Sequence, residues 1–221
     1  MPPKIGEELQ KAISGKEIRP DAEVSRKILI LSFLSMHPCS TSTAIARFLD
    51  TSERGVMWHT DSLVRKEIIG RRDGKKTRFF IRNHIRDGDC PVFSILGDER
   101  AKKILLLLEE SAGMSNTEIL EETGMARQSA RNLLGALEGA QIVRSLKEGR
   151  NRRYYLTEKL AEMREDYASR REMAGNTMKE ILNELAGSYE VLSERDGMLM
   201  ISMGDRDLKM ATDPFTGVFT G

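Results

Sequence analysis

The chain has 221 residues, a formal net charge of +1, 39% hydrophobic residues and 31% charged residues. This composition is typical of a folded, soluble protein and excludes a disordered one, and the length suits two or three small domains. There is no apolar run of about 18 residues, no apolar signal-peptide core near the first residue, and only two cysteines. We therefore expect a cytoplasmic protein without membrane contact or a disulfide framework.

The charge is distributed unevenly along the chain. Residues 24–86 contain 13 lysines and arginines against 5 acidic residues, whereas residues 161–221 contain 7 against 12. Between them the charge is nearly balanced, but positive residues cluster at 144–153. This asymmetry favours a basic N-terminal part that binds a polyanion and an acidic C-terminal part with another role. Chance variation of the surface is the alternative.

The first half of the chain predicts three helices and a hairpin, after a polar segment over residues 1–20 with a short helix near Glu7 to Ile13. Helical spacing of apolar residues, capping residues and turn residues indicate the elements. In chain order we expect a helix from Val24 to near Pro38, a second capped by Ser40, Thr41 or Ser42, a third capped by Ser52 and reaching Ile68, and a hairpin turning at Asp73-Gly74.

The same order then repeats. Helical patterns are predicted over Ile104 to Leu108, from the cap at Ser115, and over Ala126 to Gly139, before a hairpin that turns at Glu148-Gly149. A shift of 74 places Ile45 on Ile119, Leu63 on Leu137 and Ile68 on Ile142, and a shift of 75 places Gly74 on Gly149 and Arg78 on Arg153. Two copies are too few for a solenoid, so they indicate a tandem pair of globular domains.

A third, acidic region follows the second copy. Leu160, Met163 and Tyr167 form one helical stripe, which we expect to end at Gly175. A capping-box pattern at residues 177–180 predicts the start of another helix, and three short strands follow, with an apolar run from Met198 to Met203. We expect this region to form the dimer interface, because a core of this size is small on its own. A ligand-sensing domain or a cap on the chain's own winged helices are the alternatives.

The predicted fold is mainly α with small β-hairpins (α+β). The expected divisions are a polar segment at 1–20, a winged-helix domain at 21–86, a linker at 87–97, a second winged-helix domain at 98–157, a region of helices and a β-meander at 158–211, and a loose tail at 212–221.

Three helices followed by a hairpin are the order of a winged helix-turn-helix, in which the third helix enters the major groove and the wing follows the DNA backbone. Arginine suits guanine and glutamine suits adenine, and wing cations suit phosphates. The candidate DNA-binding residues are Ser52, Arg54, Met57, Trp58, Arg71, Arg72, Lys75, Lys76 and Arg78 in the first copy, and Arg127, Gln128, Arg131, Lys147, Arg150, Asn151, Arg152 and Arg153 in the second.

The run Val56-Met57-Trp58-His59, with Leu63 and Ile68-Ile69 after it, resembles the recognition helix of winged-helix regulators of the MarR/ArsR-like superfamily. It is most similar to archaeal regulators that carry such domains in tandem, and the resemblance covers residues 24–157. It implies control of transcription by a homodimer on double-stranded promoter or operator DNA. The second copy differs, with Ala130 in place of the valine and Asn132-Leu133 in place of Trp-His.

Several residues have an alternative interpretation. Trp58 could pack against the wing or the other domain, His59 could be a buried histidine rather than a phosphate contact, and the wing charges could be a solvated face. The methionines of 198–203 are expected in the core. We found no motif for catalysis, and His37 with Cys39 has no nearby partner pair for a metal, so we expect no enzyme activity, cofactor or metal. A protein-interaction scaffold in a chromosome or transcription complex, or a replication initiator, are the other functions that fit.

Overall fold

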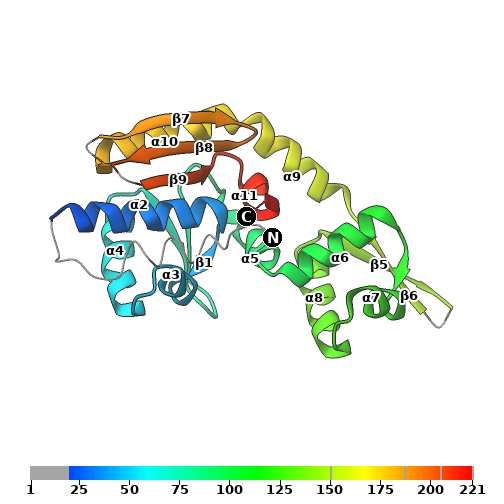
Figure 1. Ribbon diagram of the computed structural model, residues 1–221. Coiled ribbons are helices and arrows are strands. Elements are labelled where there is room, and N and C mark those ends of the chain that lie inside the picture. Colours follow the sequence, from blue (N-terminus) through cyan, green and yellow to red (C-terminus); the bar gives the residue numbers. More distant parts are fainter. Residues whose placement is uncertain (1–19, 150, 187, 205, 221) are drawn as a thin grey trace.

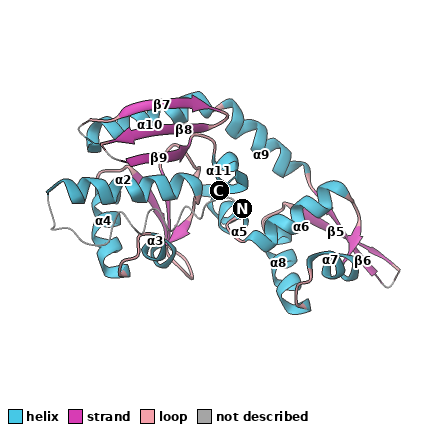
Figure 2. Cartoon of the chain, in the orientation of Figure 1, coloured by secondary structure: helices cyan, strands magenta, loops and turns pink. Residues whose placement is uncertain are grey.

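The computed structural model describes residues 20–149, 151–186, 188–204 and 206–220, and the expected helix at Glu7 to Ile13 and the wing residue Arg150 lie outside them. Among the described residues, no helix is both long enough and apolar enough to cross a membrane. The chain forms two helical halves, and its three small antiparallel sheets lie among the helices (Figures 1 and 2). The predicted α+β fold is confirmed.

The first half contains the predicted three helices and hairpin. Thr41 and Ser52 cap the second and third helices, because their side chains accept hydrogen bonds from the amides of Ala44 and Gly55. A short strand before the second helix joins the hairpin, and the sheet order is β1-β3-β2. The elements are α2 (Pro20–Met36), β1 (Ser40–Thr41), α3 (Ser42–Phe48), α4 (Glu53–Arg65), β2 (Ile69–Arg72) and β3 (Arg78–Ile81).

The second half repeats this arrangement, with the sheet order β4-β6-β5. Ser115 and Glu118 form a capping box at the start of its second helix, which ends at Gly124 in the left-handed conformation (φ 68°). Its wing strands have six residues each, against four in the first half. The elements are α6 (Glu99–Glu110), β4 (Met114–Ser115), α7 (Asn116–Thr123), α8 (Arg127–Gly139), β5 (Val143–Glu148) and β6 (Asn151–Leu156).

The segment between the halves is folded. Residues 87–97, predicted as a linker, contain the 3-10 turn η1 (Asp87–Asp89) and the helix α5 (Cys90–Leu96). Cys90, Phe93 and Leu96 are fully buried, and they belong to the core of the second half. The linker prediction missed this helix because its apolar residues pack on elements that come later in the sequence.

After the second wing come two helices, a three-stranded meander and a last helix. The predicted break at Gly175 and the predicted helix start at Thr177 are wrong: the first helix ends at Ser169 and the next runs unbroken through both positions. Gly175 faces the meander, where a Cβ atom would lie 2.5 Å from Glu194 Oε1. The elements are α9 (Glu158–Ser169), α10 (Arg171–Ala186), β7 (Glu190–Arg195), β8 (Met198–Met203), β9 (Arg206–Ala211) and α11 (Pro214–Thr220).

The meander and α10 share one core with the first half. Met178 and Leu182 of α10, with Leu199, Ile201 and Met210 of the meander, are buried in the same cluster as the apolar residues of α2. The apolar face that motivated dimerisation is thus covered within the chain, as in the alternative of a cap on its own winged helices. Dimerisation stays a prediction, but it needs another surface.

Strand β9 lies along α2, and serines of this helix form hydrogen bonds with backbone groups on the outer edge of the strand (Figure 1). Ser32 Oγ donates to the carbonyl oxygen of Lys209 at 2.7 Å, and Ser35 Oγ accepts from the amide of Ala211 at 3.0 Å. In β8, Leu199 and Ile201 are fully buried, whereas the flanking methionines at 198 and 200 are only half-buried. The methionines expected in the core thus line its margin.

The last helix, α11, lies between the two halves (Figure 1). Phe215 and Val218 are buried in the core of the second half, where Phe215 contacts the rings of Phe93 and Tyr167. On the other side, a Cβ atom on Gly217 would lie 2.8 Å from the carbonyl oxygen of Ser35. The expectation of a loose tail over residues 212–221 is therefore wrong for residues 212–220.

Candidate nucleic-acid interface

Helix α4 presents a polar and aromatic face to solvent. Val56, His59, Thr60 and Leu63 form the buried face of this helix, so Met57 and Trp58 point outward. Met57 is 50% exposed and Trp58 is 54% exposed. The alternative of a Trp58 packed on the wing or the other half is therefore wrong, while the buried interpretation of His59 is confirmed.

The Trp58 ring has a basic neighbour that the sequence did not reveal. The ammonium group of Lys27, on α2, lies 5.7 Å from the centre of the ring. This is a cation–π distance, and it adds a positive charge to the exposed face of α4. Lys27 precedes Trp58 by 31 positions, so only the packing of α2 against α4 brings the two side chains together.

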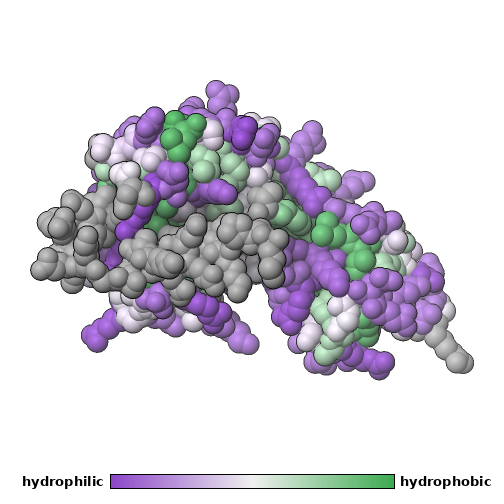
Figure 3. All heavy atoms as spheres, in the orientation of Figure 1, coloured by the Kyte–Doolittle hydropathy of each residue, from purple (hydrophilic) through white to green (hydrophobic). Residues whose placement is uncertain are grey.

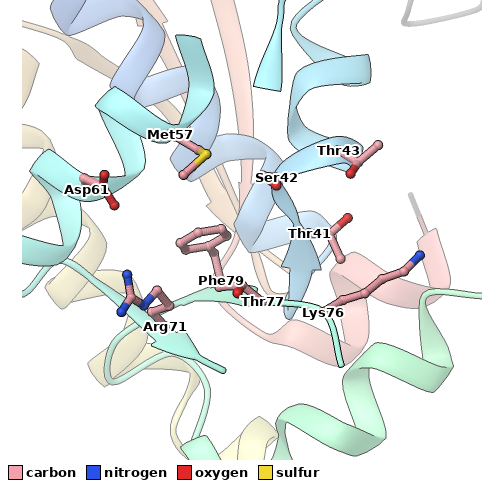
Figure 4. A pocket seen from close by; sticks show the side chains of 9 residues that line it. All are labelled: Thr41, Ser42, Thr43, Met57, Asp61, Arg71, Lys76, Thr77 and Phe79. Carbon is pink, nitrogen blue, oxygen red and sulfur yellow. The ribbon is translucent and has the colours of Figure 1, made fainter. Parts of the chain in front are cut away.

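A groove of about 350 Å³ separates α4 from the first wing (Figure 4). Arg71 and Lys76 lie on opposite sides of it, and Phe79 lies on its floor. Asp61 is the one acidic residue of the lining, so the groove has a net positive charge. The remaining lining residues are Met57, which adds an apolar side chain, and Thr41, Ser42, Thr43 and Thr77, which add hydroxyl groups suited to phosphate or sugar contacts.

Not every predicted wing cation of the first copy is available to DNA. Arg71, Lys75 and Lys76 are exposed, with Arg71 Nε 3.5 Å from Asp73 Oδ1. Arg72 instead turns back to the linker, where its Nη1 donates to the carbonyl oxygen of Asp87 at 2.8 Å. The sequence could not distinguish them, because adjacent strand residues point to opposite faces and both sides of the wing carry arginine.

Arg78 and Arg153, equivalent by sequence, make equivalent internal contacts. Arg78 Nη1 donates to the carbonyl oxygen of Cys39 at 3.0 Å, and Arg153 Nη1 donates to that of Gly113 at 2.8 Å. Both acceptors are turn residues with positive φ, at 60° and 80°. Arg153 also donates to Glu148 at 2.8 Å. These two guanidinium groups therefore hold each wing against the turn before its sheet's first strand, and fewer of their N–H groups remain for DNA.

In the second copy, α8 exposes the predicted base-reading residues. Arg127, Gln128 and Arg131 are all exposed, while Ala130 and Leu134 lie in the core. Gln128 Nε2 donates to Asn132 Oδ1 at 2.8 Å, one turn further along the helix. This contact holds the amide against the helix, so reading a base would require breaking it.

The second wing is longer and carries exposed residues of both signs. Lys147, Asn151 and Arg152 are exposed, and Arg152 Nη1 lies 3.9 Å from Glu138 Oε2. The exposed Arg144 at the base of β5 was not among the predicted residues, and its guanidinium lies 5.9 Å from the Tyr155 ring centre. The surface of this half is largely hydrophilic in the view of Figure 3.

The comparisons with known proteins bear on the second copy. Residues 99–147 match the IclR helix-turn-helix domain. The match begins with α6 and ends in β5, less than a quarter of the chain, and it contains α8. It supports a DNA-binding regulator of transcription with a winged-helix domain. No curated protein matches the chain.

Solved structures give distant similarities. The DIP2311 protein from Corynebacterium diphtheriae is 19% identical with a TM-score of 0.26, over 60% of this chain and 26% of that one. The mRNA-binding domain of elongation factor SelB from E. coli, in complex with SECIS RNA, is 17% identical with a TM-score of 0.27, over 59% and 96%. IdeR from T. acidophilum is 12% identical with a TM-score of 0.24, over 92% and 97%. This chain thus spans about a quarter of the length of the first protein. Similarities this distant give no information about the function of this chain.

Proposed function

We propose that the chain is a sequence-specific regulator of transcription that binds double-stranded promoter or operator DNA as a homodimer. Helices α4 and α8 read bases in the major groove, and the two wings lie on the backbone. The proposal keeps the tandem winged-helix architecture and the resemblance to archaeal MarR/ArsR-like regulators. It assigns no enzyme activity, cofactor or metal, and places the protein in the cytoplasm.

The observation that carries the proposal is the recurrence of one surface in both halves. Each recognition helix exposes arginine on the face opposite its buried residues, at Arg54 in α4 and at Arg127 and Arg131 in α8. Each is followed by a wing with exposed cations, such as Lys76 and Arg152. A helix and a wing with the same sign of charge fit the groove and the adjacent backbone of one duplex.

The alternative of a protein-interaction scaffold has one observation in its favour. Met57 and Trp58 form an exposed apolar pair on α4, which could meet a protein partner. Lys27 and Arg54 lie on or beside this pair, however, and a dry protein interface tends to exclude charges from its centre. Next to DNA, the same apolar groups suit a thymine methyl and the cations suit phosphates.

The first experiment measures affinity for a DNA duplex against salt concentration. If the wings contact about six to eight phosphates per dimer, log affinity falls with log salt at a slope of about −5 to −7. A slope near zero in fluorescence anisotropy would refute DNA binding by these wings.

A set of variants separates the two kinds of contact. Lys76→Ala and Arg152→Ala should weaken binding to all sequences alike and make the salt slope shallower by about one unit per contact. Arg54→Ala should relax the choice of base at particular positions, by about 1–3 kcal/mol per lost bidentate contact. The matched control is Lys209→Ala, which removes an exposed cation from the meander. An unchanged preferred sequence for Arg54→Ala in a selection experiment would show that α4 does not read bases.

A further inference from the structure

The two edges of the C-terminal sheet differ in how they are covered. Strand β9 is paired with β8 on one side, and α2 covers its other side through the hydrogen bonds of Ser32 and Ser35. Strand β7 also pairs with β8 only, but no described element of the chain pairs with its outer edge (Figure 1). An uncovered edge presents unpaired amide and carbonyl groups to any strand that approaches.

Two of the residues that commonly block edge pairing are missing from β7. The strand Glu190–Arg195 contains no proline and no lysine, which are residues that commonly block edge pairing. Its apolar residues Val191 and Leu192 are 42% and 46% exposed. Figure 3 shows hydrophobic surface at the top of the molecule, in the region where Figure 1 places the meander. The edge therefore offers both hydrogen-bonding groups and apolar area.

The charges at the two ends of β7 are complementary to each other. Glu190 pairs with Ser202 of β8, and Arg195 pairs with Met198 of the same strand, four residues before Ser202. Because side chains alternate between faces with a period of two, Ser202 and Met198 lie on the same face of the sheet, and so do their partners Glu190 and Arg195. The bulge at Leu192 makes this possible, because it adds one residue between them. Both side chains are exposed.

We infer that the outer edge of β7 pairs with the β7 edge of a second copy of this chain, antiparallel, to make one six-stranded sheet across a two-fold axis. The inference rests on the homodimer of the proposed function and names its surface. Antiparallel pairing places Glu190 opposite the partner's Arg195 at both ends of the strand pair, with Leu192 of each copy near the axis. Since α2 covers the β9 edge, the C-terminal sheet offers only its β7 edge among the described residues, and assembly through this sheet stops at two copies.

The test reverses the two charges separately and together in the full chain. Glu190→Arg or Arg195→Glu alone places like charges opposite each other at both ends, and should raise the dimer dissociation constant by about tenfold or more. The double variant Glu190→Arg/Arg195→Glu restores opposite charges and should return the constant to the wild-type value. Leu192→Asp should weaken the dimer as well. The control is Glu162→Arg, a reversal of an exposed charge on α9.

Sedimentation velocity over a range of concentrations gives the constants, and thermal unfolding followed by circular dichroism checks that each variant is folded. The inference is overturned if the wild type is a monomer at tens of micromolar, if the single reversals dimerise like the wild type, or if the double variant fails to recover. Binding to a duplex with one half-site is measured in parallel. A monomer that binds DNA contradicts this interface and the homodimer but leaves DNA binding standing, whereas a dimer that binds no DNA contradicts the DNA binding of the proposed function and leaves this interface standing.

Discussion

The burial of His84 should make the fold sensitive to mild acid. This residue follows β3 and is 3% exposed. The pKa of its imidazole is lowered from 6.5 to about 4, chiefly by burial and to a smaller extent by the nearby charge of Arg170, while the carboxylate of Asp213 and the backbone of Ala211 oppose the shift. The neutral ring is thus the form that the folded chain holds at neutral pH.

The direction and size of the effect follow from these two pKa values. Below pH 6.5 the unfolded chain binds a proton at this histidine, and the folded chain does so only near pH 4, so falling pH favours unfolding. The stability that His84 contributes is complete above pH 6.5 and is lost between pH 6.5 and pH 4. At about 1.4 kcal/mol per pKa unit, the loss between pH 7.5 and pH 5 is about 2 kcal/mol.

Urea denaturation at pH 7.5 and at pH 5 measures this difference. The variant His84→Gln carries no titrating group, so its stability should change by about 2 kcal/mol less than that of the wild type over the same range. The matched control is His37→Gln, because the pKa of His37 is also lowered by burial but its side chain is only half-buried, and the change should be smaller. If the wild type and His84→Gln lose the same stability between the two pH values, the argument from burial is refuted.

Three further predictions concern the packing of the chain. Truncation after Lys159 removes α10 and the meander from the core of the first half, so it should abolish cooperative unfolding in circular dichroism instead of merely changing the oligomeric state. Gly217→Val should cost about 2–3 kcal/mol in urea denaturation, because its Cβ atom would lie 2.8 Å from a backbone oxygen of α2; a wild-type midpoint would contradict the placement of α11. Gly135→Ala, at an exposed helical position with no atom within 4 Å of the added carbon, should raise stability by about 0.5–1 kcal/mol, and a loss would indicate a contact there.

Local features of the sequence predicted most of the elements. Capping side chains at Thr41, Ser52 and Ser115, and glycines such as Gly124 and Gly149 at positive φ, act within a few residues, so they can be recognised without the fold. The internal repeat then supported the assignment of both winged-helix units, because each turn and apolar position occurs twice.

The errors arose where distant contacts decide the structure. Gly175 resembles a helix end, but it is a point of close approach to Glu194, and the helix continues. Residues 212–220 look like a loose tail, but their partners Phe93 and Ser35 lie more than 100 positions away. In β8 every other residue does face the core, but a run that is apolar throughout does not indicate which residues these are.

The candidate site could be predicted as a set of residues but not as a surface. The periodicity of α4 placed Arg54 and Met57 outside, and both are exposed. It could not reveal that Arg72 and Arg78 bind backbone carbonyls of their own chain, since this depends on the positions of the linker and of the turn at Cys39. Hydroxyl groups such as Thr43 join the groove only because α3 begins beside the wing, directly after the strand β1 that pairs with β3.

The packing of β9 on α2 also bears on how the protein is made. The hydrogen bond from Ser32 to Lys209 joins residues 177 positions apart. At about 5–20 residues per second, a ribosome needs roughly 9–35 seconds to add that much chain. During this time α2 has left the ribosome without the strand that covers it, and its apolar residues are open to chaperones and to neighbouring nascent chains. The half that is synthesised first should therefore become rigid only after the meander has been added.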